Sequence, residues 1–415
     1  MKQITAEILT IGDEILYGQI TDTNSQWMSA ELDKLGIKVI RKTTVGDAEE
    51  VMLKAFSEAE ERADITLITG GLGPTNDDLT MPMLAKYYGV DIIENRDVLE
   101  HVRAFFESRG RIFTDLNKRQ ALVPSNAVVL HNELGTAPGT WYERNRKVFV
   151  SMPGVPHEMK HLMQVHVLPK LQDFYNTPVI YHKLIKTVGI GESFLADKIK
   201  EWEDALPEHI SLAYLPSIGH VKLRLTATGE DLESLKKDVE GLIASFMPLA
   251  GKYVYGYDKT TLEEAIGELL KKENKTIAFA ESCSGGFVQH KITSIAGSSE
   301  YFQGGLVPYH NDHKINILGV EKETIESFGA VSEQTVEQMA ENVRKLFKAD
   351  IGAVSSGIAG PGGGSEEKPV GTVWIAYADQ EKTISKKLQL TKNRKLNIEL
   401  TNIALLNLVR KSLTS

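Results

Sequence analysis

The sequence contains very little cysteine, with Cys283 the single thiol in a chain of 415 residues. One thiol cannot form an internal disulfide, which excludes the small secreted domains that depend on disulfide frameworks. No apolar stretch is long enough to span a membrane, and the first motif, Ile8–Asp13, follows no apolar signal segment. We therefore expect a cytoplasmic protein without a membrane partner.

Positive charge is also scarce. The chain carries 47 Lys and Arg residues against 56 Asp and Glu residues, a formal net charge of −9. Proteins that hold nucleic acids through their phosphates are typically basic, so we expect small-molecule partners rather than nucleic acid, although one domain could still be locally basic. The share of hydrophobic residues, 42%, and of charged residues, 25%, is that of ordinary globular proteins, which excludes disordered and fibrous classes.

The length exceeds what one hydrophobic core usually spans, so we expect several domains. In residues 1–172, strands are expected at 6–11, 39–44 and 64–69, and helices at 24–35 and 49–62. In residues 253–415, strands are expected at 277–281, 351–355 and 372–377, and helices at 260–272, 287–295 and 332–347. The first of these helices is expected to begin with a cap within Thr260–Glu264, where a hydroxyl can accept a first-turn N–H. Strands that alternate with helices predict two α/β domains with mainly parallel sheets.

The segment between these domains, residues 173–252, has a different pattern. Strands are expected at 182–188, 210–216 and 221–228, and helices at 191–203 and 231–244, which makes a small α+β module. Its turn at Val188–Glu192 is similar to the glycine loop of nucleic-acid-binding KH folds, but no Lys or Arg residues cluster there. We interpret the module as KH-like and as a spacer or dimerisation element. A homodimer is the expected assembly because it is the commonest symmetric one.

The motif Gly70–Thr80 carries the chemistry of the first domain. Glycines beyond a strand can hold a phosphate through backbone N–H groups, while Asp77 and Asp78 could hold a divalent cation that neutralises it. A glycine turn whose Asp caps the next helix is the simpler alternative.

Further acidic residues follow the neighbouring strands. They belong to the short motifs Gly12-Asp13-Glu14, Asp22-Thr23-Asn24 and Gly46-Asp47. In a parallel sheet these strand ends meet at one edge, so acidic groups are expected to gather around the glycine loop. Such a cluster requires a metal ion or protons.

Four histidines suggest a metal site, namely His101, His131, His157 and His161. The last two fit the His-Glu-x-x-His pattern of zinc proteases. A pattern this short arises easily by chance, and it follows a loop, Pro153–Pro156, that enters a helix. We therefore do not expect a zinc protease.

The Gly70–Thr80 motif resembles the molybdopterin-binding fold shared by molybdenum cofactor adenylyltransferases and insertases. The whole segment more closely resembles the amino-terminal domain of the CinA family, through the additional motifs Ile11–Leu16, Asp22–Asn24, Val45–Asp47, Asn132–Gly139 and Met152–Met159. This resemblance implies metal-dependent hydrolysis of ADP-ribose and related nucleotide pyrophosphates. It implies that Asp47 and Asp78 bind the divalent metal or activate water. The implied substrate contacts come from Gly70, Gly71, Gly73 and Thr75 for the phosphates, with Asp13 and Asn24 nearby.

The segment Ala280–Gly286 places a carboxylate, two hydroxyls, a thiol and two glycines after a short apolar run. Ser282 and Cys283 are both candidate nucleophiles, but only one of two adjacent side chains can face a cleft. Burial as a small packing residue is the simpler role for Cys283. No histidine fits a Ser-His-Asp order, so Tyr309 is a candidate base if the Lys314 ammonium stabilises its phenolate. The N–H groups of the two glycines could hold a phosphate or an oxyanion.

The third segment resembles the nicotinamide mononucleotide deamidase family, which is also the carboxyl-terminal domain of CinA proteins. The motifs are 280–286, 295–299, 309–314, 329–332, 356–361 and 364–373. The resemblance implies no cofactor at this site and four catalytic residues: Ser282 as nucleophile, Tyr309 as catalytic tyrosine, Lys314 beside it and Ser356 as a supporting hydroxyl. Gly285 and Gly286 then serve as oxyanion donors.

Two positions depart from the family pattern. Ser284 replaces a threonine, and Asn393 replaces the aspartate that commonly precedes Arg394. Arg394 could bind the substrate phosphate through a bidentate contact, or it could belong to a solvated basic face of the last helix.

The sequence thus predicts a CinA-like bifunctional hydrolase of nucleotides. The carboxyl-terminal site would convert nicotinamide mononucleotide to nicotinate mononucleotide and ammonia in pyridine nucleotide salvage, and the amino-terminal site would cleave a nucleotide pyrophosphate. Two alternatives remain: a molybdopterin-handling enzyme that binds a pterin at the Gly70 loop, and a non-enzymatic partner in competence or recombination, which only the family's name suggests.

Overall fold

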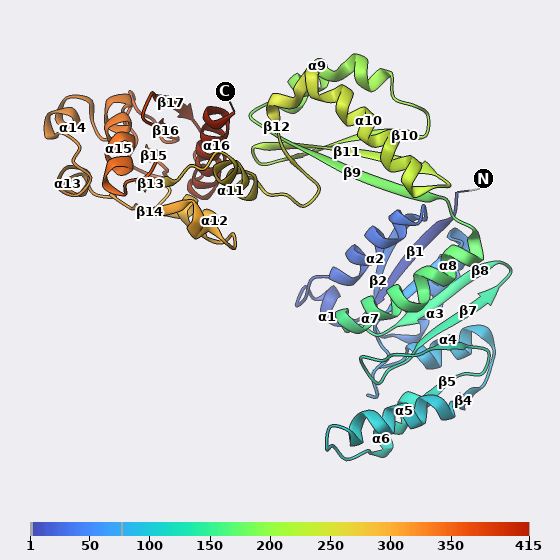
Figure 1. Ribbon diagram of the computed structural model, residues 1–415. Coiled ribbons are helices and arrows are strands. Elements are labelled where there is room, and N and C mark those ends of the chain that lie inside the picture. The colour runs from blue at the N-terminus through green and yellow to red at the C-terminus, as the bar shows by residue number, and fades with distance from the viewer. Residues whose placement is uncertain (1–2, 76–77, 415) are drawn as a thin grey trace. The chain divides into compact units, whose positions relative to one another are not determined.

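The computed structural model describes residues 3–75 and 78–414. The chain divides into two compact units, residues 1–182 with 227–237 and residues 183–226 with 238–415. Figure 1 shows the elements of each unit in order along the chain. The domain boundaries expected at residues 172 and 252 stay predictions.

The first unit is built on a six-stranded sheet with the order β2-β1-β3-β8-β7-β6. Its strands are β1 (Thr5–Ile11), β2 (Lys38–Val45), β3 (Ile65–Thr69), β6 (Val128–Leu130), β7 (Gly139–Arg144) and β8 (Lys147–Met152). The first four strands of that order are parallel. β7 pairs antiparallel with β8, and β6 pairs antiparallel with β7. The predicted mainly parallel sheet is confirmed here, and the carboxyl ends of β1, β2, β3 and β8 share one edge.

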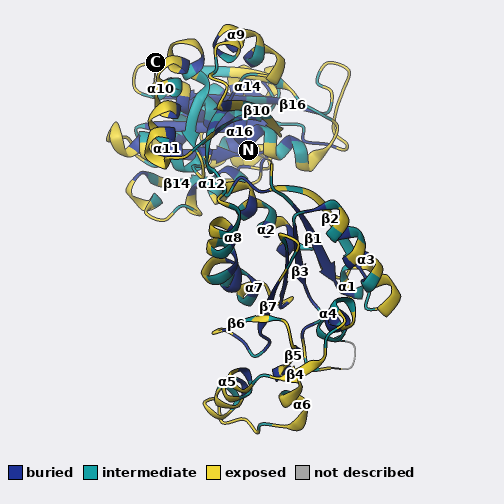
Figure 2. Ribbon diagram, turned by 90° about the vertical axis from the view of Figure 1, so that its right-hand side faces the viewer, coloured by how far each residue is buried: buried dark blue, intermediate teal, exposed yellow. Residues whose placement is uncertain are grey.

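Helices cover both faces of this sheet. On one face, α2 (Thr23–Lys34), α7 (Pro156–Leu162) and α8 (Leu168–Tyr175) contribute Met28, Met159 and Leu171 to one core cluster. On the other face, α3 (Glu49–Arg62) and α4 (Thr80–Tyr88) contribute Phe56 and Leu84 to a second. The central strands β1 and β3 are buried between these layers (Figure 2).

A small lobe extends the first unit beyond α4. It contains the two-stranded antiparallel pair β4 (Ile92–Glu94) and β5 (Leu122–Pro124), the helices α5 (Arg96–Glu107) and α6 (Asp115–Lys118), and a 3-10 turn at Arg119–Ala121. Val98, Val102 and Ala121 form its own small core. The one-turn helix α1 (Asp13–Leu16) follows β1 directly.

The KH-like module has a four-stranded sheet with the order β10-β11-β9-β12. Its elements are β9 (Val179–Val188), α9 (Glu192–Asp204), β10 (Ile210–Ser217), β11 (His220–Gly229), α10 (Leu232–Ala250) and β12 (Val254–Tyr257). The three strands and two helices that the sequence predicts in this segment are confirmed. Only β12, which follows a short 3-10 turn, lies outside the prediction.

Two glycine turns of this module pack against the last helix of the chain, α16 (Arg394–Leu413). A Cβ atom added to Gly189 would lie 2.5 Å from the Asn407 amide nitrogen, and one added to Gly219 would lie 2.8 Å from an Ile403 methyl. Val188 also belongs to the core cluster that contains Ile403. Gly189 therefore lies close to α16, while Gly189, Gly191 and Glu192 of the loop are exposed, and the expectation that this module does not bind nucleic acid stays a prediction.

The sheet of the carboxyl-terminal domain has the order β14-β13-β15-β16-β17. Its strands are β13 (Ile277–Glu281), β14 (Phe302–Leu306), β15 (Ile351–Gly357), β16 (Thr372–Ala378) and β17 (Thr383–Gln389). The first three strands of that order are parallel and the last two are antiparallel. The turns after β13 and β15 lie at the same edge of the sheet, which places the Ser282 segment beside Ser356.

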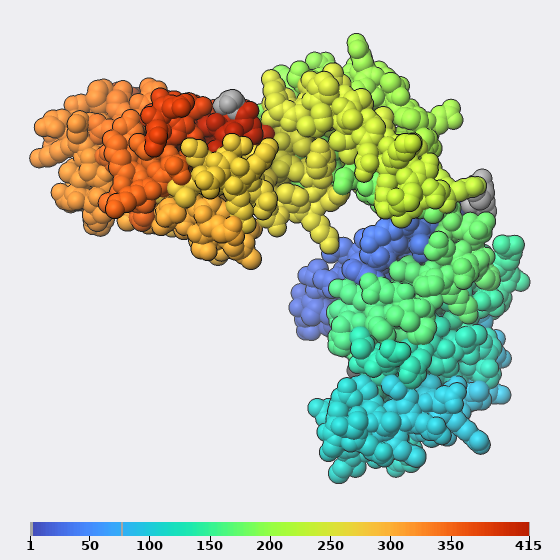
Figure 3. Space-filling view, viewed as in Figure 1, coloured from blue at the N-terminus to red at the C-terminus, as the bar shows by residue number. Residues whose placement is uncertain are grey.

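The helices of this domain again form two layers. One face carries α11 (Leu262–Lys272), α12 (Phe287–Thr293) and α16, whose side chains share one core cluster; the surfaces of α11 and α16 adjoin in Figure 3. The other face carries α14 (Lys322–Phe328) and α15 (Glu333–Leu346), while the short α13 (Asn311–Asn316) follows Tyr309. The capped start of α11 is confirmed, because Thr261 and Glu264 form a reciprocal capping box. Across the described residues of both units, no helix has the length and apolar character required to cross a membrane.

Candidate active sites

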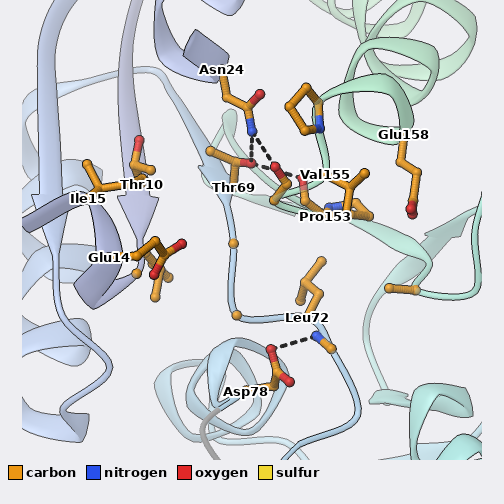
Figure 4. A pocket seen from close by; sticks show the side chains of 18 of the residues that line it. Thr10, Glu14, Ile15, Asn24, Thr69, Leu72, Asp78, Pro153, Val155 and Glu158 are labelled. Atoms are coloured by element: carbon orange, nitrogen blue, oxygen red, sulfur yellow. Dashed lines mark hydrogen bonds between the residues drawn. The ribbon is translucent and has the colours of Figure 1, made fainter. Parts of the chain in front are cut away.

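A cavity of about 680 Å³ opens at the carboxyl edge of the first sheet (Figure 4). The segments that line it include the end of β1 with α1, the start of α2, the glycine loop after β3, and the loop from β8 into α7. Its lining includes Glu14, Asp22, Asn24, Asp47, Gly70, Gly71, Gly73, Asp78, Gln120 and Glu158. The acidic motifs that the sequence places after neighbouring strands therefore do meet around the glycine loop.

Two of the predicted residues lie outside this cavity. The Asp13 carboxylate accepts a hydrogen bond of 3.2 Å from the Tyr17 hydroxyl, and Asp13 does not line the cavity. Thr75 instead lines a smaller neighbouring cavity of about 240 Å³, which shares Gly71, Gly73 and Asp78 with the first. Asp77, expected beside Asp78, lies outside the described residues.

The Asp78 carboxylate is bound by the glycine loop itself. It accepts hydrogen bonds from the Gly73 N–H at 2.7 Å, the Thr75 N–H at 2.9 Å and the Thr75 hydroxyl at 2.5 Å. The Gly70 N–H donates to the Met152 carbonyl at 3.1 Å. Gly70, Gly73 and Thr75 were expected to donate to a phosphate, but in this structure their donors are engaged within the protein. The simpler alternative, an Asp that caps the next helix, does not describe Asp78 either, because the N-cap of α4 is Leu79 and makes no side-chain cap hydrogen bond.

Gly70 is required by backbone geometry. Its φ is +109°, and an added Cβ atom would lie 2.1 Å from the carbonyl oxygen of Ile11, which no side-chain rotation can relieve. Thr80 closes the loop by donating its hydroxyl to the Gly70 carbonyl at 2.9 Å. The loop and the end of β1 therefore approach each other as closely as two backbones can.

We expect Gly70→Ala to destabilise the first unit by more than about 2 kcal/mol, because both a forbidden φ and a backbone overlap must be relieved. Gly18→Ala is the matched control, since Gly18 has a φ of +70° but nothing within 4 Å of the added Cβ. Urea unfolding of both variants measures the difference. Equal midpoints for the two variants would show that the close approach at Gly70 is not rigid.

The charged residues that line the larger cavity are all acidic: Glu14, Asp22, Asp47, Asp78 and Glu158. No Lys, Arg or His is among the lining residues. Within residues 3–75 and 78–414, no group of three or more His, Cys, Asp or Glu side chains is arranged to hold a metal ion without further ligands. An anionic ligand in this cavity would therefore need a cation to accompany it.

The four histidines do not form a metal site among the described residues. His161 lies 3.4 Å from the Glu133 carboxylate, and the His101 ring nitrogen contacts the Gly135 carbonyl at 3.0 Å. His131 packs edge-on against His101. The expected absence of a zinc protease stays a prediction.

In the carboxyl-terminal domain, a buried carboxylate supports the Ala280–Gly286 turn. Glu281 is fully buried at the end of β13, and its two carboxylate oxygens accept the N–H groups of Val288 and Gln289 at 3.0 and 2.8 Å. It thereby satisfies donors at the start of α12, where negative charge is also favoured by the helix dipole. Gly285 and Gly286 complete the turn with φ of +64° and +92°. The sequence places Glu281 in the turn but does not indicate this supporting role.

Ser282, Cys283 and Ser284 are all buried, and their contacts distinguish them. Cys283 belongs to the core cluster under α12 and α16, and burial raises the pKa of its thiol to about 11. The hydroxyl of Ser284 bonds to that of Ser355 at 2.7 Å. The hydroxyl of Ser282 makes no side-chain hydrogen bond to any residue that the structure describes. The packing role expected for Cys283 is confirmed, and Ser282 is the hydroxyl that remains free to react.

Lys314 and Tyr309 do not form the pair that we expected. Lys314 is 1% exposed, and its ammonium donates to the backbone carbonyls of Pro308 and Tyr309 at 2.8 and 3.3 Å. The Tyr309 side chain is 58% exposed, and its hydroxyl accepts a hydrogen bond of 3.0 Å from Arg394. Burial lowers the pKa of Lys314, and its charge interacts with the Cys283 thiol in the adjacent turn. The ammonium therefore binds the backbone of Pro308 and Tyr309 rather than the phenol hydroxyl.

Arg394 and Ser356 are held by backbone carbonyls. Arg394 donates to the Gly360 carbonyl at 3.0 Å as well as to Tyr309, so it links two loops and is not simply part of a solvated face. Ser356 is buried and donates its hydroxyl to the Ala330 carbonyl at 2.7 Å. Asn393 caps α16 by accepting the Leu396 N–H at 3.2 Å, which an aspartate could equally do. The departure at Asn393 therefore leaves the position of Arg394 intact.

We expect Lys314→Met to reveal the cost of burying this charge. The folded pKa of Lys314 is below its ordinary value, so between these two values the unfolded chain binds more protons and the free energy of unfolding rises with pH. Urea unfolding of wild type and Lys314→Met, measured as pH is raised towards 10.5, should therefore show the wild type gaining stability relative to the variant. A difference that does not vary with pH would contradict the lowered pKa.

Two cavity residues, Glu158 and Gln120, were not predicted as site residues. Glu158 is the glutamate of the His-Glu-x-x-His segment, a pattern that suggests a zinc site rather than a separate carboxylate. Gln120 lies in the small lobe, where no strand or helix is predicted from the sequence. The motif Met152–Met159 could have indicated Glu158, because it marks the loop from a strand end into α7.

Three family models match the chain in succession. They are described as "Probable molybdopterin binding domain" over residues 7–173, "Damage-inducible protein CinA KH domain" over residues 182–256 and "CinA C-terminal domain" over residues 259–413. Fold and site thus define a chain with a molybdopterin-binding-like α/β domain, a KH-like module and a second α/β domain.

Similar proteins are named CinA-like. A CinA-like protein of Cytophaga hutchinsonii is 54% identical over 99% of this chain and 98% of its own, and one of Flavobacterium psychrophilum is 44% identical over 95% of each. A solved structure of the competence/damage inducible protein CihA from Agrobacterium tumefaciens is 36% identical over 37% of this chain and 94% of its own, with a TM-score of 0.36. The chain belongs to the CinA family, as the sequence motifs predict.

Proposed function

We propose that the carboxyl-terminal site hydrolyses the carboxamide of nicotinamide mononucleotide to nicotinate mononucleotide and ammonia. The observation that carries this proposal is the turn beyond β13, where the buried Ser282, whose hydroxyl makes no side-chain hydrogen bond to a described residue, follows the buried carboxylate of Glu281 and precedes two glycines of positive φ. Amide hydrolysis needs a nucleophile, a proton acceptor and oxyanion donors. This turn supplies candidates for the nucleophile and the oxyanion donors.

In the proposed reaction, the Ser282 oxygen attacks the carboxamide carbon and loses its proton to a base. The resulting oxyanion is stabilised by backbone N–H groups of the turn, ammonia leaves, and water hydrolyses the ester to release nicotinate mononucleotide. The Gly285 N–H already donates to the Ser282 carbonyl at 3.2 Å. Gly286 is therefore the better oxyanion donor of the two glycines.

Two groups are candidates for the proton acceptor, Lys314 and Tyr309. A buried lysine whose pKa is lowered provides a neutral amine more readily than an exposed one. The Tyr309 hydroxyl is engaged with Arg394, which suits a residue that positions the substrate. Arg394 uses two of its five donors in the structure, so others remain for the substrate phosphate.

For the amino-terminal site we propose metal-dependent cleavage of ADP-ribose or a related nucleotide pyrophosphate. The all-acidic cavity supports this proposal, because a pyrophosphate cannot enter it without a cation. Carboxylate oxygens are suitable ligands for a hard divalent ion, and Mg²⁺ typically uses one or two carboxylates together with substrate phosphates, so a complete protein cage is not required. Asp47 and Asp78 would hold the ion, which would neutralise the phosphates and acidify a bound water.

A pterin ligand is the second candidate for the same cavity. The description of the family model over residues 7–173 favours it. Assembly as a homodimer and a place in pyridine nucleotide salvage stay predictions.

The test uses the purified full-length protein with each substrate separately. Ammonia release from nicotinamide mononucleotide, and release of AMP from ADP-ribose with added Mg²⁺ or Mn²⁺, are the expected activities. Absence of the first would remove the deamidase proposal. Absence of the second together with tight binding of molybdopterin would favour the pterin alternative.

A further inference from the structure

Two sequence motifs with no assigned role come together at one wall of the amino-terminal cavity. The first is Asn132–Gly139, which leads into β7, and the second is Met152–Met159, which leads from β8 into α7. They meet at Glu158, in the first turn of α7, whose carboxylate lines the cavity. Figure 4 shows Glu158 reaching from α7 on the side opposite Glu14.

The Glu158 carboxylate is held in place by a buried amide. Asn132 is 2% exposed, and its side-chain nitrogen donates to Glu158 Oε2 at 2.6 Å and to the Ala137 carbonyl at 2.8 Å. The Asn132 amide oxygen accepts the Leu134 N–H at 3.2 Å, which fixes the orientation of the amide. Gly135 makes room for this contact, since an added Cβ atom would lie 2.0 Å from Glu158 Oε2. Both motifs therefore serve to position one carboxylate.

Glu158 differs from Asp22, Asp78 and Glu14, three other acidic residues of the cavity, in what its oxygens do. Asp22 accepts the Thr10 hydroxyl through one oxygen and the Ser25 N–H through the other. Asp78 is likewise bound through both oxygens. Glu14 is exposed and is not held by a buried partner. Glu158 is half-buried, has one oxygen fixed by Asn132, and its Oε1 makes no hydrogen bond to a described residue.

We propose that Glu158 is the general base of the amino-terminal site and that Asn132 is its positioning residue; this inference rests on the proposed pyrophosphatase function. The oxygen of a water molecule forms a bond to one phosphorus of the pyrophosphate, and the bond from that phosphorus to the bridging oxygen breaks. A proton of the water passes to Glu158 Oε1 and then to solvent. The bridging oxygen leaves on the other phosphate, so ADP-ribose yields AMP and ribose phosphate with no change in oxidation state.

The decisive variant is Glu158→Gln in the full-length protein. Glutamine keeps an oxygen for Asn132 but cannot accept the proton, so kcat for ADP-ribose should fall by about 10²–10⁴-fold. The dissociation constant for ADP-ribose should change by less than about threefold, since a general base acts on the transition state. Thermal unfolding should match wild type. Glu133→Gln is the matched control, because that neighbouring carboxylate lies outside the cavity and is 63% exposed.

Asn132→Asp tests whether Glu158 accepts a proton in the reaction or has only a structural role. It puts a second carboxylate against Glu158, which should raise the pH at which kcat reaches half its maximum. Glu158→Asp keeps a base and should retain more activity than Glu158→Gln.

Wild-type kcat in Glu158→Gln, or an unchanged pH profile in Asn132→Asp, would overturn the inference while leaving the proposed pyrophosphatase intact. If the wild type cleaves no nucleotide pyrophosphate with Mg²⁺ or Mn²⁺, the proposed function fails and the inference fails with it.

Discussion

Ser282→Ala is expected to reduce ammonia release from nicotinamide mononucleotide by on the order of 10³-fold or more, because a covalent mechanism loses its nucleophile. The fold should be kept, since the Ser282 hydroxyl holds no side-chain hydrogen bond to a described residue, and the Ser282 N–H bond to the Ser355 carbonyl, 2.9 Å, is retained by alanine. Ammonia release at saturating substrate, together with the urea unfolding midpoint, measures both expectations.

Its two chain neighbours provide the matched controls. Ser284→Ala removes a hydroxyl from the same turn, one that bonds to Ser355, and Cys283→Ala removes a thiol whose pKa is raised to about 11 by burial. Both changes should lower the urea unfolding midpoint, while both variants should keep most of the wild-type kcat. A Ser282→Ala protein with wild-type turnover, or a Cys283→Ala protein with none, would refute the assignment of the nucleophile.

Removal of divalent metal is expected to lower one of the two proposed activities and to leave the other unchanged. Treatment with a chelator should lower ADP-ribose cleavage by on the order of 10³-fold, because the ion is required both to admit the pyrophosphate and to stabilise the developing charge. Nicotinamide mononucleotide deamidation should not change, since the residues proposed for that site include no metal ligands. Both rates can be measured in one sample before and after the metal is restored.

Asp47→Asn tests the same site without a chelator. It should weaken metal activation of ADP-ribose cleavage, so that more Mg²⁺ or Mn²⁺ is needed for half-maximal rate. Deamidation that also depends on metal would contradict a metal-free carboxyl-terminal site. ADP-ribose cleavage that survives complete chelation would contradict the electrostatic argument from the acidic cavity.

The regular elements of this protein could be predicted from sequence where apolar periodicity is strong. The helix Glu49–Arg62 is predicted with its observed bounds, and β1, β2 and β3 of the first sheet within one residue of theirs, whereas β6, β7 and β8 are not predicted. The strand Phe302–Leu306 was not predicted, because Gly304 and Gly305 interrupt its pattern and give it no side chains to alternate. The edge strand Thr383–Gln389 escaped prediction because it is half exposed and carries two lysines.

The site residues could be listed from sequence, but their partners could not. The gathering of Asn24, Asp47 and Asp78 around one cavity follows from parallel strands that share an edge. The binding of Asp78 by its own loop depends on backbone positions that spacing does not specify. The burial of Lys314 could not be predicted either, because lysine is almost never fully buried. The Lys314 side chain reaches backbone carbonyls five and six residues away, which sequence spacing does not indicate.

The packing of the KH-like module on α16 has a consequence for how this chain could be divided. Ile403 is 8% exposed and shares a cluster with Val188, and Asn407 closes over Gly189. A carboxyl-terminal fragment that begins at Lys259 would carry Ser282, Tyr309, Lys314 and Arg394, yet it would uncover the apolar side of α16. We expect such a fragment to associate or aggregate unless Ile403 is replaced by a polar residue. The module would then keep the following domain soluble by covering this apolar surface.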